Sequence, residues 1–327
     1  MNSKLKNIAI AAVAILAVSS CAKDKEESSN SVQERILQAW ISENYPTARP
    51  TPLGSYLLTQ TEGTGKQLGQ KEAGAVYIDY STKSLAGQYT YTSDAQIAKQ
   101  LGSYSADTYY GPKLMEVGYG STYSGLEELL RMMKEGGSLT AVVPPWLTVS
   151  EYGGSMQQES VSVIYQIQLR HVITNIQDFQ RDTLQAFSNK YYDGIDSLAE
   201  GFYFKKLYDS GNDTIEQSDY ANVWYVGKLL DGWVFDTNIA DTAKKYGLYN
   251  ASTTYDPLIV SYGTTWSDMK ESNGLVGGFC RALKNMTYED KAVTFFWSTL
   301  GYGSDGSGEI SAFQPLFFYL EIDKKDE

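Results

Sequence analysis

The stretch VWYVGKLLDGWVFD, residues 223–236, decides the fold class of this chain of 327 residues. It has the β-type alternation of apolar residues, and it follows a segment around Leu184 whose apolar residues have helical spacing. A short helix near Gly278, an apolar strand at 292–297 and a last alternating strand at Leu316–Ile322 come after it. Several strands with one short helix predict an α+β module, in which the helix packs on one face of an antiparallel sheet.

The same order of segments occurs twice along the chain, which suggests a duplication. Three segments recur: LQAW (37–40) as LQAF (184–187), GSYL (54–57) as GFYF (201–204), and GLEELL (125–130) as GFCRAL (278–283). The first two pairs share an offset of 147 (184 minus 37), and the third has an offset of 153 (278 minus 125), which insertions in loops explain. We therefore expect a helix, a module, a second helix and a second module.

This order gives the expected domain boundaries. The first module with its own helix occupies residues 32–172, and its last strand is expected at 161–169. A linker helix follows at 173–198, and the second module occupies 199–327. The segments 237–256 and 264–273 are interpreted as insertions beside the site of the second module, and either of them could cover it.

Composition limits the chemistry that this chain can perform. Hydrophobic residues make up 42% and charged residues 20%, a balance that supports a buried core and excludes wholesale disorder. The 39 acidic residues outnumber the 27 basic ones, so the formal charge of -12 would repel phosphate backbones and no nucleic-acid partner is expected. A single histidine, His171, and two cysteines exclude a zinc finger, a His-rich metal centre and a disulfide scaffold. We expect no metal and no organic cofactor.

The N-terminus has the features of a secretion signal. Lys4 and Lys6 precede an apolar run of eleven residues, 8–18, which is too short to span a bilayer. Val18-Ser19-Ser20-Cys21 resembles a bacterial lipobox, and the resemblance implies removal of residues 1–20 and acylation of Cys21. The alternative is an ordinary signal peptide that happens to contain this cysteine.

A polar segment, residues 21–31, would then be the tether between the lipid and the fold. Its acidic residues resemble the surface-export signals of some Gram-negative lipoproteins. The expected location is therefore extracytoplasmic, with a lipid anchor in the outer membrane on its periplasmic or surface face. Only Cys280 would remain as a structural thiol, and it is interpreted as a small buried hydrophobic residue.

Residues 223–236 resemble the signature of FKBP-type peptidyl-prolyl cis-trans isomerases. Later segments keep register with that family: 276–279 matches the pocket helix, 300–303 the loop that follows, and 315–322 the closing strand. The resemblance covers about residues 199–323. It implies a five- or six-stranded antiparallel half-barrel wrapped on a short helix, with an apolar pocket between them that receives a proline ring.

The resemblance also implies the residues of the pocket. Phe235, Asp236 and Tyr302 would be catalytic, and the substrate-binding positions would be Tyr225, Leu258, Val276, Phe279, Ile310 and Phe318. Phe279 stands where the family usually has a tryptophan floor, Leu258 where another aromatic residue is common, and Ile310-Ser311-Ala312 replaces the usual Ile-Pro-Pro.

The chemistry of such a pocket needs no nucleophile. Rotation about a prolyl amide faces a barrier of about 18–20 kcal/mol, because resonance gives the C–N bond double-bond character. An aromatic pocket that excludes water removes the solvent stabilisation of the charge-separated planar amide, and it fits a twisted amide better than a planar one. Tyr302 would donate to a substrate carbonyl, and Asp236 would orient Tyr225 or the twisted amide nitrogen. The expected partners are proline-containing polypeptides.

Residues 54–172 resemble the same family less closely. Thr90-Tyr91 stands about where the family has Phe-Asp, Leu126 replaces the aromatic floor, and Tyr165 lies where the closing strand has Phe. We interpret the first module as a degenerate copy that serves as a scaffold or a binding surface.

Simpler interpretations remain open for each residue of the proposed site. The phenylalanines are equally typical of an ordinary core, Asp236 of a turn cap, and Tyr302 of a turn within Gly-Tyr-Gly. The rival function is a non-catalytic binding lipoprotein that holds a peptide, a glycan or a protein partner on faces rich in its 26 tyrosines.

Overall fold

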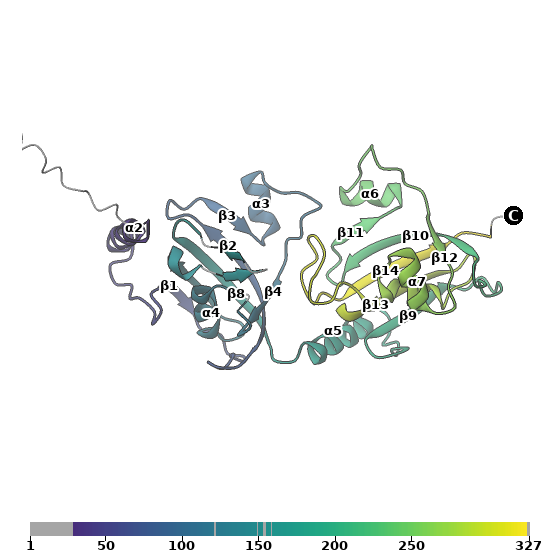
Figure 1. The fold of residues 1–327 in the computed structure, drawn as a ribbon, viewed down its shortest axis with the longest axis horizontal. Helices are drawn as coiled ribbons and strands as arrows, with labels where there is room; N and C mark the ends of the chain where they lie inside the picture. Colours follow the sequence, from purple (N-terminus) through teal and green to yellow (C-terminus); the bar gives the residue numbers. More distant parts are fainter. Residues whose placement is uncertain (1–28, 121, 149, 153–154, 158, 326–327) are drawn as a thin grey trace, which may run out of the picture.

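The structure, a computed structural model, describes residues 29–325 apart from residues 121, 149, 153–154 and 158. The expected secretion signal and Cys21 lie outside the described residues. Figure 1 shows two modules that lie end to end and are joined by the helix α5 (Ile176–Tyr191). Within the described part of the chain, every helix is too short or too polar to cross a membrane.

The first module is built on a six-stranded antiparallel sheet. Its strands are β1 (Tyr56–Thr61), β2 (Gly74–Lys83), β3 (Tyr89–Thr92), β4 (Lys113–Val117), β5 (Ser138–Val143) and β8 (Val163–Ile173). They are ordered β1-β5-β8-β2-β3, and β4 also pairs with β2. The 3₁₀ helix η1 (Pro145–Leu147) and the hairpin β6 (Ser150–Tyr152) and β7 (Ser155–Gln157) lie between β5 and β8. The helix α4 (Ser124–Arg131) packs its buried leucines against one face of the sheet.

The second module repeats this architecture strand for strand. Its strands are β9 (Phe202–Tyr208), β10 (Tyr220–Leu229), β11 (Val234–Thr237), β12 (Leu258–Ser261), β13 (Lys291–Phe296) and β14 (Leu316–Ile322). They are ordered β11-β10-β14-β13-β9, with β12 also on β10, so β9 to β14 follow the order of their counterparts in the first sheet. The helix α8 (Gly277–Leu283) packs in the place of α4, and η2 (Ser298–Leu300) corresponds to η1. The expected α+β fold with two such modules is confirmed.

Each sheet has a second helix on its other face. In the first module this helix is α2 (Ser29–Asn44), which buries Leu37, and in the second it is α5, which buries Leu184. A Gln–Tyr hydrogen bond ties helix to sheet in both copies: Gln38 Nε2 lies 2.8 Å from the Tyr56 hydroxyl, and the Tyr203 hydroxyl lies 3.0 Å from Gln185 Oε1.

The linker helix α5 is therefore part of the packing of the second module. The Phe187 ring packs edge-on against Phe295 at 5.1 Å and against Phe317 at 6.1 Å. The buried amide of Gln180 donates to Ser298 Oγ at 3.0 Å and accepts from the Ser298 backbone N–H at 2.7 Å.

One expected strand boundary is wrong. The last strand of the first module runs over Val163–Ile173 instead of 161–169, because it pairs with the full length of the bulged strand β2. The segment 237–256 contains the helix α6 (Ala240–Tyr246), which has a counterpart in α3 (Ala95–Leu101) of the first module. Both helices end at a left-handed glycine, Gly102 with φ 70° and Gly247 with φ 75°. Among the described α-helices of the second module, only α7 (Trp266–Asn273) lacks a counterpart in the first module.

The residues set aside as structural lie in ordinary surroundings. Cys280 on α8 is fully buried, and burial raises the pKa of its thiol to about 12, so it remains protonated. The exposed side chain of His171 on β8 lies 3.8 Å from Glu135.

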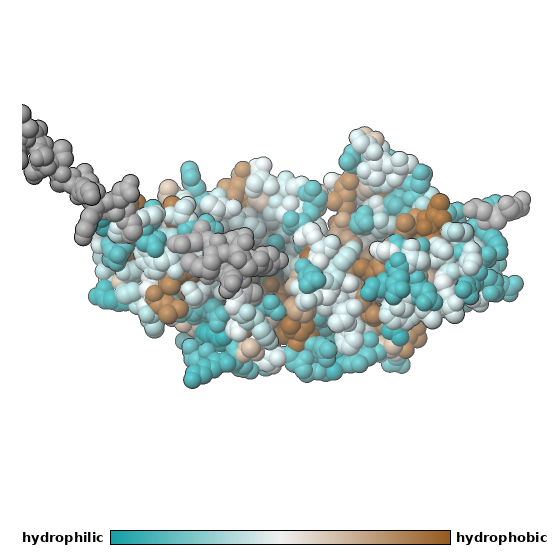
Figure 2. All heavy atoms as spheres, viewed as in Figure 1, coloured by the Kyte–Doolittle hydropathy of each residue, from teal (hydrophilic) through white to brown (hydrophobic). Residues whose placement is uncertain are grey.

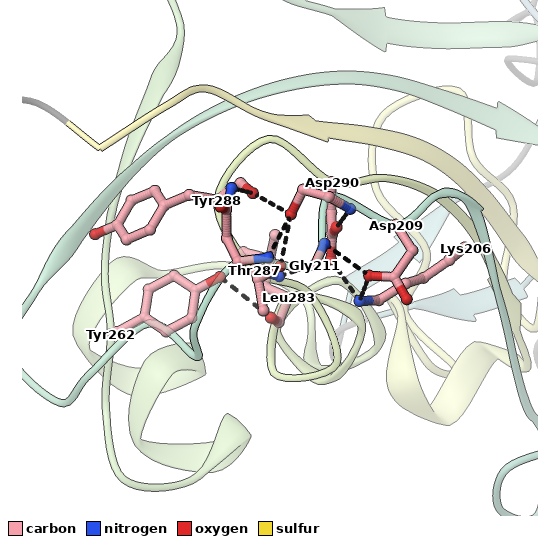
Figure 3. Close-up of polar contacts among 10 residues, drawn as sticks. Lys206, Asp209, Gly211, Tyr262, Leu283, Thr287, Tyr288 and Asp290 are labelled. Carbon is pink, nitrogen blue, oxygen red and sulfur yellow. Dashed lines mark hydrogen bonds and ion pairs between the residues drawn. The ribbon is translucent and has the colours of Figure 1, made fainter.

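One buried carboxylate joins three segments of the second module (Figure 3). Asp290 is 0% exposed; it accepts from Lys206 Nζ and from the backbone N–H groups of Ser210 and Thr287, each at 2.8 Å. Burial by itself would raise the pKa of Asp290, but these donors outweigh it and hold the pKa below its usual value. The ionised carboxylate therefore stabilises the fold.

We predict that Asp290→Asn lowers the free energy of unfolding of the second module by about 2 kcal/mol at pH 7, because charge-assisted hydrogen bonds are lost in a buried place. The folded pKa lies below the unfolded value of about 3.9, so this contribution is complete above that pH and is lost as the pH falls through the folded pKa. Urea unfolding between pH 3 and pH 7 measures both effects.

Asp209 offers a matched control. It accepts from the same Lys206 Nζ at 2.8 Å, but its side chain is 66% exposed. Asp209→Asn should cost less than about 1 kcal/mol. Equal losses for the two variants would contradict the role given to Asp290.

Candidate functional site

The predicted site residues come from six segments that meet on the α8 side of the second sheet. Strand β10 carries Tyr225, strand β11 carries Phe235 and Asp236, and strand β14 carries Phe318. Alternation along β10 directs Val223, Tyr225 and Leu229 to this side, where they join the same core cluster. The remaining predicted residues lie on α8 or just before it, on β12, and in the loop 301–315: Phe279, Val276, Leu258, Tyr302 and Ile310. All of the apolar and tyrosine members pack on this one cluster.

Phe318 is the centre of the aromatic arrangement. Its ring centroid lies 5.2 Å from Phe279 at 89° and 5.7 Å from Phe235 at 84°, both edge-to-face contacts. Tyr225 adds an edge contact with Phe279 at 5.8 Å. Phe279 and Phe318 are only 3% and 4% exposed, whereas Phe235 and Tyr225 are partly exposed. Phe279 and Phe318 therefore lie in the dry core, and Phe235 and Tyr225 connect them to the solvent.

A hydrogen-bonded pair lies at the edge of these walls. The Tyr225 hydroxyl donates to Asp236 Oδ2 at 2.7 Å. Burial and then the Asp236 charge raise the pKa of Tyr225, so it remains a donor at any physiological pH. Two roles were considered for Asp236, and this contact fits the one in which Asp236 orients Tyr225.

Tyr302 lies near the same carboxylate. Its pKa is raised, first by burial and then by the charge of Asp236, so its hydroxyl stays protonated. Within the described part of the chain this hydroxyl has no hydrogen-bond partner, in contrast with that of Tyr225. It is available to donate to a bound molecule.

Gly227 is a site residue that sequence reasoning missed. A Cβ atom at this position would lie 2.6 Å from the Phe235 ring and 2.9 Å from the Phe318 ring, both closer than real contacts allow. Gly227 pairs with Asp236 on β11 and with Phe318 on β14, so it is the point over which the two rings meet. A glycine within an apolar strand was the available signal, because it often marks a close approach of other groups.

The register of the first module identifies the matching positions there. Thr82 on β2 pairs with Tyr91 and with Tyr165, as Gly227 pairs with Asp236 and Phe318. Both sheets have an irregularity at this point of the hairpin. Thr90 and Tyr91 therefore occupy the positions that correspond to Phe235 and Asp236 in the second module, as the sequence indicates.

These substitutions give the first module a different interior. Thr82 takes the place of the glycine, and its Oγ1 lies 2.8 Å from Thr90 Oγ1 in the space that a phenylalanine ring would need. Tyr91 stacks on Tyr80 at 4.7 Å instead of offering a carboxylate. The position of Phe279 is held by the buried Leu126. No aromatic slot is formed by these residues.

A cavity of about 630 Å³ lies beside α4, away from the predicted site. Its charged side chains are already occupied by partners of the same module. Arg131 bonds Glu127 and the carbonyls of Gly69 and Glu72, and Glu128 accepts from Thr51 and the Leu53 N–H. It offers no free acid–base pair, and the described residues include no group of three or more His, Cys, Asp or Glu able to hold a metal ion.

Comparisons with known proteins point to the second module. Residues 211–323 match the family described as FKBP-type peptidyl-prolyl cis-trans isomerase. The chain is 25% identical over 218 residues to the FKBP-type 22 kDa peptidyl-prolyl cis-trans isomerase of Escherichia coli (strain K12), which covers 64% of this chain and 89% of that protein.

Two solved structures are similar to parts of the chain. The three FKBP domains of wheat FKBP73 cover 85% of this chain and 98% of their own, with 15% identity and a TM-score of 0.28. A peptidyl-prolyl cis-trans isomerase of Pseudomonas syringae pv. tomato covers 46% of this chain and 96% of its own, with 22% identity and a TM-score of 0.32.

We predict that Gly227→Ala lowers the free energy of unfolding by about 1–3 kcal/mol, because the new methyl group overlaps the Phe235 ring. Adding Phe235→Thr removes the ring and should recover part of that loss, since the first module has threonines at both places. A double-mutant cycle measured by urea unfolding tests this. Strictly additive losses would show that the two residues do not compete for one space.

Proposed function

We propose that the second module isomerises X-Pro bonds in the aromatic pocket between β10, β11, β14 and α8, because residues 211–323 match the family described as FKBP-type peptidyl-prolyl cis-trans isomerase. The observation that carries this proposal is the convergence of Phe235, Phe279 and Phe318 beside Tyr302 and the Tyr225–Asp236 pair. These residues are separated by up to 93 positions (318 minus 225) in the chain.

The pocket acts on the amide by its shape and its dryness. A pyrrolidine ring on the floor of Phe279 and Phe318 removes the prolyl bond from water, and the planar, charge-separated amide loses hydration. The free hydroxyl of Tyr302 donates to a substrate carbonyl, and Asp236 holds Tyr225 as a fixed dipole at the edge of the pocket. The twisted amide is bound more tightly than either planar form, so the barrier falls in both directions.

The substrates of this proposal are folding or secreted polypeptides with exposed X-Pro bonds, whose spontaneous isomerisation takes tens of seconds or longer. We place the protein outside the cytoplasm, anchored by lipid at Cys21 in the outer membrane. Support for this location comes from the charged start, the apolar run 8–18 and the Val-Ser-Ser-Cys segment of the sequence.

We predict that Phe235→Ala, Asp236→Ala lowers kcat/KM by at least about tenfold, because the wall and the polar pair are both lost. A chymotrypsin-coupled assay on a Phe-Pro peptide measures the rate. The matched control is Thr90→Ala, Tyr91→Ala, which changes the corresponding positions of the first module and should leave the rate within about twofold.

The rival, non-catalytic binding function predicts no acceleration of isomerisation in the same assay. If the wild type and the double variant both isomerise the peptide at the rate of buffer alone, the second module is a binding module and the catalytic proposal fails. Binding of a proline-containing peptide, followed by the fluorescence of Trp233 near Phe235, then tests the non-catalytic alternative.

The anchor has a test of its own. We predict that Cys21→Ser moves the protein from the outer-membrane fraction to the soluble fraction and abolishes its labelling by a fatty-acid probe, because the acylated thiol is absent. Cys280→Ser, which changes the buried cysteine of α8, should leave the labelling unchanged. Equal labelling of the wild type and Cys21→Ser would contradict lipidation at this residue.

A further inference from the structure

A residue of the first module lies in the core of the second. Tyr109, in the loop between α3 and β4, is only 2% exposed and belongs to the same cluster as Phe279, Ile310 and Phe318. In Figure 2 the surface is hollowed at the upper edge where the two modules meet, between α3 and α6. The loop reaches across this junction, and its Ala106 lies against Gly247 at the end of α6.

Tyr109 contacts both sides of the proposed pocket. Its hydroxyl donates to Asp231 Oδ2 at 2.8 Å, in the turn that leads into β11. Its backbone N–H donates to Glu309 Oε2 at 3.3 Å, in the loop that carries Tyr302 and Ile310. Tyr109 of the first module is thus bonded both to the turn before β11 and to the loop 301–315 of the second module.

On the β11 side, the contacts of Tyr109 extend through Asp231 and Trp233 to Phe235, a residue of the proposed pocket. Asp231 Oδ1 accepts from the backbone N–H of Trp233 at 3.0 Å. The Trp233 ring centroid lies 5.3 Å from that of Tyr109 and 6.4 Å from that of Phe235. The indole N–H of Trp233 donates to the Ala106 carbonyl at 3.3 Å, so the first module holds the indole from two directions. Trp233 is two residues before Phe235, so its position affects where the strand presents the wall of the pocket.

The second module has a copy of this loop without the tie. Tyr104 and Tyr110 stack at 5.2 Å in the first module, and Tyr249 and Tyr255 stack at 5.2 Å in the second, which sets an offset of 145 (249 minus 104). This offset puts the exposed Thr254 in the place of Tyr109. The loop architecture is common to both modules, and the tyrosine that enters the neighbouring core is an addition in the first.

We propose that Tyr109 is a positioning residue for the second module, fixing the spacing between the β11 wall and the loop 301–315 through Asp231 and Glu309. The degenerate first module thereby acts on the reaction without touching the substrate. The catalytic part of this inference rests on the function proposed above. Burial raises the pKa of Tyr109, so its hydroxyl remains a hydrogen-bond donor near neutral pH.

The test compares Tyr109→Phe with Tyr104→Phe in the full chain. The first removes only the hydroxyl that bonds Asp231, and the second makes the same change in the same loop on a ring that is 44% exposed. We expect Tyr109→Phe to lower kcat/KM by about threefold to thirtyfold, and Tyr104→Phe to leave it within about twofold. The double variant Tyr109→Phe, Asp231→Asn should lower kcat/KM no further than either change alone, because each change disrupts the same Tyr109–Asp231 hydrogen bond.

Amide hydrogen exchange supplies a readout that does not require activity. With the tie released, amides of β11 and of the loop 301–315 should exchange faster, while those of β13 stay as in the wild type. Unchanged kinetics and unchanged exchange in Tyr109→Phe, with an active wild type, overturn the positioning role. A uniform increase over the whole second module also overturns it, because the tyrosine then only stabilises the fold.

An inactive wild type has a separate meaning. It overturns the proposed function, and with it the catalytic part of the inference. The exchange experiment then decides by itself whether Tyr109 holds the two walls together.

Discussion

The contact of two phenylalanine rings over Gly227 is the constraint on which the candidate site of the second module depends. Strand β10 lies between β11 and β14, and only a residue without a side chain lets Phe235 and Phe318 meet edge-to-face at 5.7 Å across it. That meeting brings one ring to the floor and the other to the wall. The remaining features, the Tyr225–Asp236 pair and the loop with Tyr302, are arranged around it.

The first module shows what the same topology becomes when this contact is absent. Thr82 and Thr90 fill the space with a short hydrogen-bonded pair, and the sheet keeps its strand order and its irregular hairpin. The fold is therefore tolerant of either filling, since each module has its own buried core, under α4 in the first and under α8 in the second. The aromatic slot is a local feature of one copy, and the fold does not require it.

Much of this arrangement could be predicted from the sequence, because apolar alternation and recurring segments report directly on sheets and repeats. The order of elements, the position of the helices and the alignment of Thr90-Tyr91 with Phe235-Asp236 all follow from such local patterns. The role of Gly227 could not be predicted from such patterns, since it depends on which strands flank β10. Tyr109 was also missed, because nothing in its own segment indicates that it is buried in a module more than a hundred residues away. The correspondence of α3 with α6 was missed, although AQIAKQLG (95–102) and ADTAKKYG (240–247) share four identical positions at an offset of 145 (240 minus 95) and both end at a left-handed glycine.

The packing of α5 defines where the second module begins as an independent body. Phe295 and Phe317 on the outer face of its sheet are covered by Phe187, and Ser298 is bonded by Gln180, so the helix is part of that layer. A fragment that starts at β9 would expose this aromatic surface to water and would be prone to aggregate. The smallest piece of chain that keeps its own interior covered starts at residue 176, and even that piece leaves the site of Tyr109 empty.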